Sequence, residues 1–304
     1  MTTTTIALDI GGTYIKGEVA GPDGILRDSE RWSTGAERGP DAALDTVVAA
    51  AAELAARYRP AAAGIAVPGI VDEASGVSVL AASLDWRRLP CRDRFAEALG
   101  IPVAIGHDVR AGGLAEARLG AGRGSRNFLF GPVGTGIAAA LMVDERALAG
   151  SHAMAGELGH LPTRSGDEAC PCGSQGCLET VASAAAVARR YTAATGEPGV
   201  TAKDVGERAA AGDQTTVAVW QAAIEALADG LATAITLLDP ERIVIDGGLA
   251  RAGEPYFGPL RTAVAERLAF QTAPEIVPAE LGHQAGCQGA ALLAGDLLTA
   301  RSAR

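Results

Sequence analysis

The segment ALDIGGTYIKGEVAGPDG, residues 7–24, contains the motif that decides the fold. Apolar residues on both sides of the glycine pair predict two short strands, at Thr5–Asp9 and Ile15–Ala20. Gly21–Gly24 has the composition of a hairpin turn, and a third strand is predicted at Ile25–Arg31. The chain therefore begins with a small antiparallel sheet whose first turn is rich in glycine.

The segment FLFGPVGTGIAAALMVDE, residues 128–145, has the same design of strand, Gly-Thr turn and strand. An offset of 122 residues places Gly12 on Gly134 and Thr13 on Thr135. Two copies of this unit suggest two similar domains that face each other. Gly-Thr turns also recur by chance, and the repeat alone leaves both explanations open.

Helices and strands alternate along the rest of the chain, which predicts an α/β fold. The glycine-rich run at 120–125 suggests a domain boundary. We expect an N-terminal domain at 1–120, completed by the C-terminal helix at about 288–304, and a C-terminal domain at 121–287. The other expected elements are helices at 41–57, 109–118, 216–238 and 288–300, and strands at 64–67, 103–106 and 242–245.

Composition excludes several classes of protein. The chain has 304 residues, of which 20% are charged and 4% aromatic, and its net charge is −10. These values exclude a disordered chain or a coiled coil, and they argue against a nucleic-acid binder or a basic membrane-surface protein. The N-terminus shows no secretory signal, and charged residues interrupt the apolar stretch Val47–Ala63, so we expect a cytoplasmic protein without a membrane span.

The glycine turn at Asp9–Lys16 has the chemistry of a phosphate site. Adjacent glycines (Gly11, Gly12) let backbone N–H groups approach phosphate oxygens, and the Thr13 hydroxyl adds a donor. Asp9, at the end of a strand, can hold Mg²⁺ directly or through water. On these residues alone, a plain tight hairpin is the slightly better explanation. Further glycine turns after predicted strands strengthen the phosphate interpretation, and they are Gly134-Thr135-Gly136 and Gly247-Gly248.

Cysteines and one histidine gather in a short segment. Cys170, Cys172 and Cys177 follow His160, and three thiolates with one imidazole complete the tetrahedral shell of zinc. Four protein ligands leave no open position, so this zinc is predicted to be structural. Three free cysteines in a loop are the alternative.

Two glutamates, Glu157 and Glu179, flank this metal-binding segment. Carboxylates fixed by a metal-braced loop suit hydrogen bonding to sugar hydroxyls, although two solvated surface charges are the simpler alternative. Asp108 lies where an apolar strand ends and a helix begins, so it is either a helix cap or a general base. Caps are the commoner of the two.

Together these motifs resemble the ROK family of bacterial sugar kinases and repressors, in the actin-like ATPase superfamily. The resemblance runs from Ile6 to about Ala294. The family's phosphate motif Asp-x-Gly-Gly-Thr-x-x-Lys matches Asp9 to Lys16 completely, and its Glu-x-Gly-His and Cys-x-Cys-Gly-x-x-Gly-Cys-x-Glu signatures match 157–160 and 170–179.

The resemblance implies a two-domain α/β fold of the actin-like ATPase (ribonuclease H-like) type with a zinc-binding loop. It implies that ATP, Mg²⁺ and structural zinc are the cofactors and that Asp108 is the catalytic base. Glu157, His160 and Glu179 would bind the sugar, and His160 would also bind zinc. The nucleotide would be bound by residues of three turns, namely Asp9, Gly11, Gly12, Thr13, Lys16, Gly134, Thr135, Gly136, Gly247 and Gly248.

Two positions depart from the family pattern, and both belong to the family's sugar pocket. His107 stands where an asparagine usually precedes the base, and Ser83 stands where another asparagine is usual. The shorter Ser83 leaves room for a bulkier sugar. If neutral His107 contacts the sugar, the sugar KM should rise as the pH falls below about 6.5, the ordinary pKa of histidine.

We therefore expect an ATP-dependent kinase for the 6-hydroxyl of a hexose or N-acetylhexosamine, with N-acetylglucosamine slightly favoured over glucose. The expected assembly is a homodimer or homotetramer without nucleic-acid or membrane partners. A sugar-responsive regulator and a non-catalytic sugar sensor are the alternatives. The sequence leaves open which sugar is preferred and whether ATP or polyphosphate is the donor.

Overall fold

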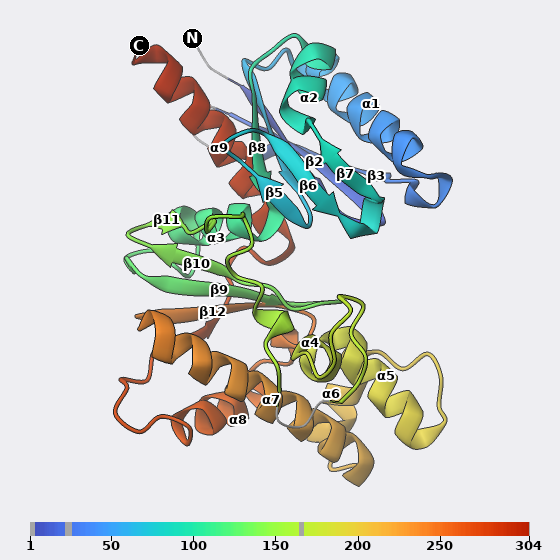
Figure 1. Ribbon diagram of the computed structural model, residues 1–304, viewed down its shortest axis with the longest axis vertical. Coiled ribbons are helices and arrows are strands. Elements are labelled where there is room, and N and C mark those ends of the chain that lie inside the picture. Colours follow the sequence, from blue (N-terminus) through green and yellow to red (C-terminus); the bar gives the residue numbers. More distant parts are fainter. Residues whose placement is uncertain (1–3, 22–25, 164–166, 304) are drawn as a thin grey trace. The chain divides into compact units, whose positions relative to one another are not determined.

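The computed structural model describes residues 4–21, 26–163 and 167–303 (Figure 1). The predicted hairpin turn at Gly21–Gly24 lies largely outside the described residues. Within them the strands are β1 Thr5–Ile10, β2 Tyr14–Ala20, β3 Leu26–Ser33, β4 Ala62–Val67, β5 Ile70–Asp72, β6 Val77–Ala81, β7 Trp86–Leu89, β8 Val103–His107, β9 Phe128–Val133, β10 Ala140–Val143, β11 Arg146–Ala147, β12 Arg242–Gly247 and β13 Glu275–Pro278. The helices are α1 Pro40–Tyr58, α2 Cys91–Leu99, α3 Asp108–Leu119, α4 Glu179–Ala182, α5 Ala184–Thr195, α6 Ala202–Ala210, α7 Gln214–Leu238, α8 Glu254–Ala265 and α9 Ala285–Ser302.

Two five-stranded sheets have the same strand order. One runs β3-β2-β1-β4-β8 and the other β11-β10-β9-β12-β13. In each sheet the first strand forms an antiparallel hairpin with the next (β1 with β2, β9 with β10) and a parallel pair with a later strand (β4 or β12). The repeat predicted from the two Gly-Thr segments is therefore confirmed as a repeat of sheet topology.

The chain folds into two compact units. Unit 1 comprises Met1–Arg118, Ala147–Ala155 and His283–Arg304, and unit 2 comprises Leu119–Arg146 and Gly156–Gly282. The sequence predicts two domains that divide after residue 120, with the C-terminal helix completing the first. That these are independently folding domains stays a prediction. No motif or change of composition marks the short segment Ala147–Ala155, which groups with unit 1.

The sheet of unit 1 has two different faces because side chains alternate along a strand. Ile6 and Leu8 of β1 belong to the apolar cluster that includes residues of α1, while Ala7 belongs to an alanine-rich cluster with residues of α9. Small residues let α9 approach closely: a Cβ on Gly64 of β4 would lie 1.8 Å from the Ala290 carbonyl oxygen. Figure 1 shows the strands of unit 1 between α1 and α9.

Helix α7 is the central helix of unit 2. It contacts α4, α5, α6 and α8, and its buried residues include Ile224, Leu227 and Leu231. In the part of the chain that the structure describes, α7 is the one helix long and apolar enough to cross a membrane, and half of its most apolar stretch is buried inside the protein. This helix is not the stretch Val47–Ala63 that the sequence suggests as the most apolar. Its burial and its contacts are those of a core helix.

Candidate functional site

The first glycine turn joins β1 to β2 in unit 1. Gly11 N–H donates to the Tyr14 carbonyl at 2.8 Å, the Thr34 hydroxyl donates to the Gly11 carbonyl at 2.9 Å, and the Thr13 side chain is exposed. Neither Gly11 nor Gly12 has a positive φ. The glycines are needed here for space, because a Cβ on Gly12 would lie 2.9 Å from the Ser83 Cβ.

Gly12→Val is expected to raise the KM for ATP by roughly 10- to 100-fold, which corresponds to the loss of one charge-assisted hydrogen bond. The added side chain would meet Ser83 and fill the space through which a phosphate reaches the backbone N–H groups. The measurement is calorimetric binding of a non-hydrolysable ATP analogue. Ser83→Gly removes the Cβ that a side chain at position 12 would meet. The double variant Gly12→Ala/Ser83→Gly therefore separates steric strain from blocked approach of the phosphate. Unchanged nucleotide affinity in Gly12→Val would contradict the phosphate-site interpretation.

Asp9 lies near the end of β1, before this turn, beside a cation and a helix. Lys16 Nζ is 3.4 Å from Asp9 Oδ2 and donates to the His283 carbonyl at 2.9 Å. A Cβ on Gly286, in the first turn of α9, would lie 2.7 Å from Asp9 Oδ2. Burial raises the pKa of Asp9, and the Lys16 ammonium opposes this shift. A half-buried carboxylate at a strand end has the oxygen donors that Mg²⁺ prefers.

Glu18 is a buried acid on β2 that belongs to none of the predicted site residues. It is 4% exposed, and its Oε2 has no hydrogen-bond partner among the described residues. Burial, and next the Asp9 carboxylate, raise the pKa of Glu18 to about 7, against the opposing effect of Lys16. The folded protein therefore holds a proton on Glu18 more tightly than the unfolded chain does.

Glu18→Gln is expected to increase the free energy of unfolding by about 1–3 kcal/mol at pH 8 and to leave it unchanged at pH 4. Because folding raises the pKa of Glu18 from 4.5 to about 7, the wild-type protein loses stability as the pH rises through this range. Glutamine has the same shape and never becomes charged. Urea unfolding at the two pH values is the measurement. An equal difference at both pH values would show that Glu18 is not protonated by folding.

Asp108 begins α3, directly after His107, the last residue of β8. Asp108 Oδ1 accepts a hydrogen bond from the Val109 N–H at 2.7 Å and lies 3.3 Å from the His107 Nε2. The His107 side chain accepts a hydrogen bond from the backbone N–H of Arg110, three residues further along the chain, with Nδ1 3.3 Å from the Arg110 nitrogen. The capping role considered for Asp108 therefore belongs to His107.

The pH dependence expected of His107 is wrong. His107 is 7% exposed, and burial together with the Arg110 charge lowers its pKa to about 3. Its ring stays neutral well below pH 6.5, so its titration cannot raise the sugar KM near that pH. Whether His107 contacts the sugar stays a prediction.

Two further residues, which no sequence motif reveals, hold this strand–helix junction in unit 1. Glu73 Oε1 accepts from the His107 N–H at 2.8 Å and from Arg110 Nε at 2.9 Å. Arg110 is 3% exposed and also donates to the Val71 carbonyl at 2.8 Å. Glu73 follows β5 and belongs to no motif, so only its position in the fold reveals it.

The second glycine turn, Gly134–Gly136, lies in unit 2, and the residues just after it pack against the segment that carries Glu157. The Gly156 carbonyl accepts from the Ala139 N–H at 2.7 Å, and a Cβ on Gly159 would lie 2.2 Å from the Ile137 carbonyl oxygen. A Cβ on Gly136 would lie 2.9 Å from Glu179 Oε2. The turn, Glu157 and Glu179 are therefore neighbours within one unit.

The third turn, Gly247-Gly248, begins at the last residue of β12 and adjoins the second one. Gly247 pairs in register with Val133, the residue before Gly134, and has a φ of 106°, which favours glycine. A Cβ there would lie 2.1 Å from the Val133 carbonyl oxygen. The structure thus brings two of the three predicted nucleotide turns together at the ends of neighbouring strands of unit 2.

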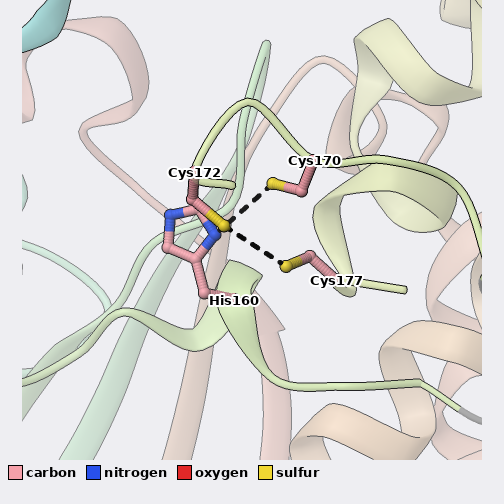
Figure 2. Close-up of side chains that lie close together, drawn as sticks. All are labelled: His160, Cys170, Cys172 and Cys177. Atoms are coloured by element: carbon pink, nitrogen blue, oxygen red, sulfur yellow. Dashed lines mark hydrogen bonds between the residues drawn. The ribbon is translucent and has the colours of Figure 1, made fainter. Parts of the chain in front are cut away.

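The four predicted zinc ligands form one cluster (Figure 2). The donor atoms of His160, Cys170, Cys172 and Cys177 all lie within 4.8 Å of one another, and Figure 2 shows their side chains converging. The Sγ atoms of Cys172 and Cys177 are 3.7 Å apart, and Cys170 Sγ is 3.8 Å from His160 Nδ1. Zn–S bonds of about 2.3 Å place two sulfurs of a tetrahedron about 3.8 Å apart, so the residues fit a structural zinc ion.

Both predicted sugar-binding glutamates lie beside this cluster. His160 Nδ1 is 3.8 Å from Glu179 Oε1, and His160 Nε2 is 3.7 Å from Glu157 Oε2. Cys170 Sγ lies 3.3 Å from Glu179 Oε1. A metal-binding histidine commonly donates its other N–H to a carboxylate, which fixes the orientation of both groups. The metal cluster can therefore position Glu157 and Glu179.

Two α/β units with the same sheet order, each with a glycine turn after the equivalent strand, define a duplicated α/β fold. The chain belongs to the ROK family, whose family model matches residues 5–296. The predicted resemblance and the actin-like ATPase fold class are thereby confirmed.

Several known proteins are similar to this chain. A glucokinase of Thermotoga maritima is 30% identical over 94% of this chain and 95% of its own length. An N-acetylmannosamine kinase of Escherichia coli O1:K1 is 31% identical over 97% of this chain and 100% of its own length. The crystal structure of a ROK family glucokinase from Streptomyces griseus, in complex with glucose and AMPPNP, has a TM-score of 0.85 at 29% identity and covers 96% of this chain and 99% of that one.

Proposed function

We propose that this protein transfers the terminal phosphoryl group of ATP to the 6-hydroxyl of a hexose or N-acetylhexosamine. The observation that carries the proposal is Asp108, a half-buried carboxylate fixed at the start of α3 in a ROK chain whose phosphate turns keep their glycines. Phosphoryl transfer depends mostly on positioning and charge stabilisation, and a carboxylate that accepts the hydroxyl proton completes the set of groups needed.

We assign one role to each group from its chemistry. Asp108 accepts the proton of the attacking hydroxyl. Glu157, His160 and Glu179 hydrogen-bond other hydroxyls of the sugar, and the glycine turns donate backbone N–H groups to the phosphates. Mg²⁺ held at Asp9 would neutralise phosphate charge, and zinc at the His160 cluster would keep the neighbouring glutamates in place.

For the preferred sugar we propose N-acetylglucosamine slightly ahead of glucose. The Ser83 side chain is exposed and lies against Gly12, where it leaves more room than the family's usual asparagine. The similar proteins are named for glucose and for N-acetylmannosamine, so both a plain and an N-acetylated hexose belong in the test.

The test measures ADP formation with ATP and a panel of glucose, N-acetylglucosamine, N-acetylmannosamine, mannose, fructose and allose. ³¹P NMR of the product identifies the phosphorylated oxygen, and a parallel series replaces ATP with polyphosphate. We expect a 6-phosphate with at least one hexose. If calorimetry detects sugar binding but no combination of sugar and phosphoryl donor gives turnover, the result would instead indicate a sugar sensor or regulator. Light scattering of the same samples tests the proposed homodimer or homotetramer, and cell fractionation tests the proposed cytoplasmic location.

A further inference from the structure

The ring of His107 has a defined partner at each nitrogen. Nδ1 lies 3.3 Å from the Arg110 backbone nitrogen and accepts its N–H, while Nε2 lies 3.3 Å from Asp108 Oδ1. Because Nδ1 is an acceptor, the single proton of the neutral ring must be on Nε2. That proton is therefore on the ring nitrogen that lies 3.3 Å from Asp108 Oδ1.

We propose that His107 is a positioning residue for the base: it orients the Asp108 carboxylate through Nε2–H while the Arg110 N–H fixes the ring at Nδ1. This inference rests on the proposed function, in which Asp108 accepts the proton. It assigns His107 a role different from the direct sugar contact expected at this position.

Two groups then contact the same oxygen of the base. Asp108 Oδ1 receives the Val109 N–H at 2.7 Å from the helix and faces His107 Nε2 from the strand. A hydrogen bond on one side and a polar N–H group on the other restrict rotation of the carboxylate. A misplacement of about 1 Å at a reacting group can lower a rate about 100-fold, so this restriction affects turnover.

His107 can hold the base because it is itself held. Glu73 Oε1 accepts both the His107 backbone N–H and the Arg110 Nε–H, and Arg110 is buried. Burial and the Arg110 charge also lower the pKa of His107 to about 3. Nδ1 therefore stays an acceptor at every pH at which the enzyme would work, and the ring keeps one orientation.

Amide side chains can separate the two contacts of the ring. In asparagine the amide atoms stand one bond from Cγ, as Nδ1 does, so His107→Asn can keep the Arg110 contact but does not reach the place of Nε2. In glutamine the amide nitrogen stands one bond further out, so His107→Gln can present an N–H to Asp108. His107→Leu keeps apolar bulk and removes both contacts.

Steady-state kinetics of the three variants test the proposal. We expect kcat to fall roughly 10- to 100-fold in His107→Leu and His107→Asn and to stay within about threefold of wild type in His107→Gln. The sugar KM should stay within about threefold in all of them. A tenfold rise in sugar KM with unchanged kcat would overturn the proposal in favour of a sugar contact. Equal activity of the Asn and Gln variants would overturn it as well. If His107→Leu does not fold, the Asn and Gln pair decides.

A second measurement does not depend on turnover. The chain has four histidines, and the His107 signals are assigned by their absence from His107→Gln. In ¹⁵N NMR of the imidazole rings we expect His107 as a neutral ring protonated on Nε2, with a shift that changes in Asp108→Ala. A ring protonated on Nδ1 would overturn the positioning role even if the kinase activity is confirmed. If His107 has the expected tautomer but the protein has no kinase activity, the contact is intact and the proposed function is wrong.

Discussion

Asp108→Asn is expected to lower kcat by roughly 10²- to 10⁴-fold with every hexose that the protein phosphorylates, the range that a general base contributes. The amide keeps the size of the side chain and its position at the start of α3, but it cannot accept the hydroxyl proton. Sugar binding, measured by calorimetry, should stay measurable because the other sugar-binding groups are unchanged.

Asp296→Asn is a matched control for this result. Asp296, on α9, forms an exposed ion pair with Arg118 at the far end of α3, with N···O distances of 2.8 Å. Exposed pairs contribute little to stability, so the control should have wild-type kcat. A loss of less than tenfold in Asp108→Asn would show that Asp108 is not the base.

Cys172→Ser is expected to release zinc, lower the melting temperature and weaken sugar binding together. Purified wild-type protein should contain one zinc per chain, and the variant much less, by elemental analysis. A hydroxyl is a poor zinc ligand, and loss of the ion frees His160, whose ring lies beside Glu157 and Glu179. The combined effect distinguishes a metal-braced sugar site from a loop that merely holds cysteines.

Cys91→Ala provides the comparison for the zinc experiment. Cys91 is a buried thiol of unit 1, outside the metal cluster. Its replacement is expected to leave the zinc content and the sugar KM unchanged, whatever it does to stability. The absence of zinc from unchelated wild-type protein would refute the metal assignment.

The local chemistry of the candidate site could be read from the sequence. Cys-x-Cys-Gly-x-x-Gly-Cys with an upstream Glu-x-Gly-His contains one complete ligand set, and the structure gathers those four residues. The glycine turns at Gly11 and Gly134 are recognisable because short apolar strands flank them. These features depend on residues close together in the chain, and their chemistry follows from residue type and spacing.

Tertiary structure alone decided what surrounds those motifs. Glu73 and Arg110 are 37 residues apart, and nothing in their spacing predicts that they bind each other beside His107. Gly286 comes close to Asp9 because α9 returns to the sheet that begins the chain. The pKa of His107 depends on burial and on Arg110, which only the folded chain places beside it.

The sequence by itself determined the family, the repeated glycine turns and the cluster of one histidine and three cysteines, since each is encoded in a short run whose residue types and spacing carry the chemistry. The tertiary structure decided which side chain caps α3, why Gly12 must be small, and that Glu18 is buried with no partner for Oε2 among the described residues. These properties arise from packing and desolvation between segments that are distant in the chain, and a linear pattern does not contain them.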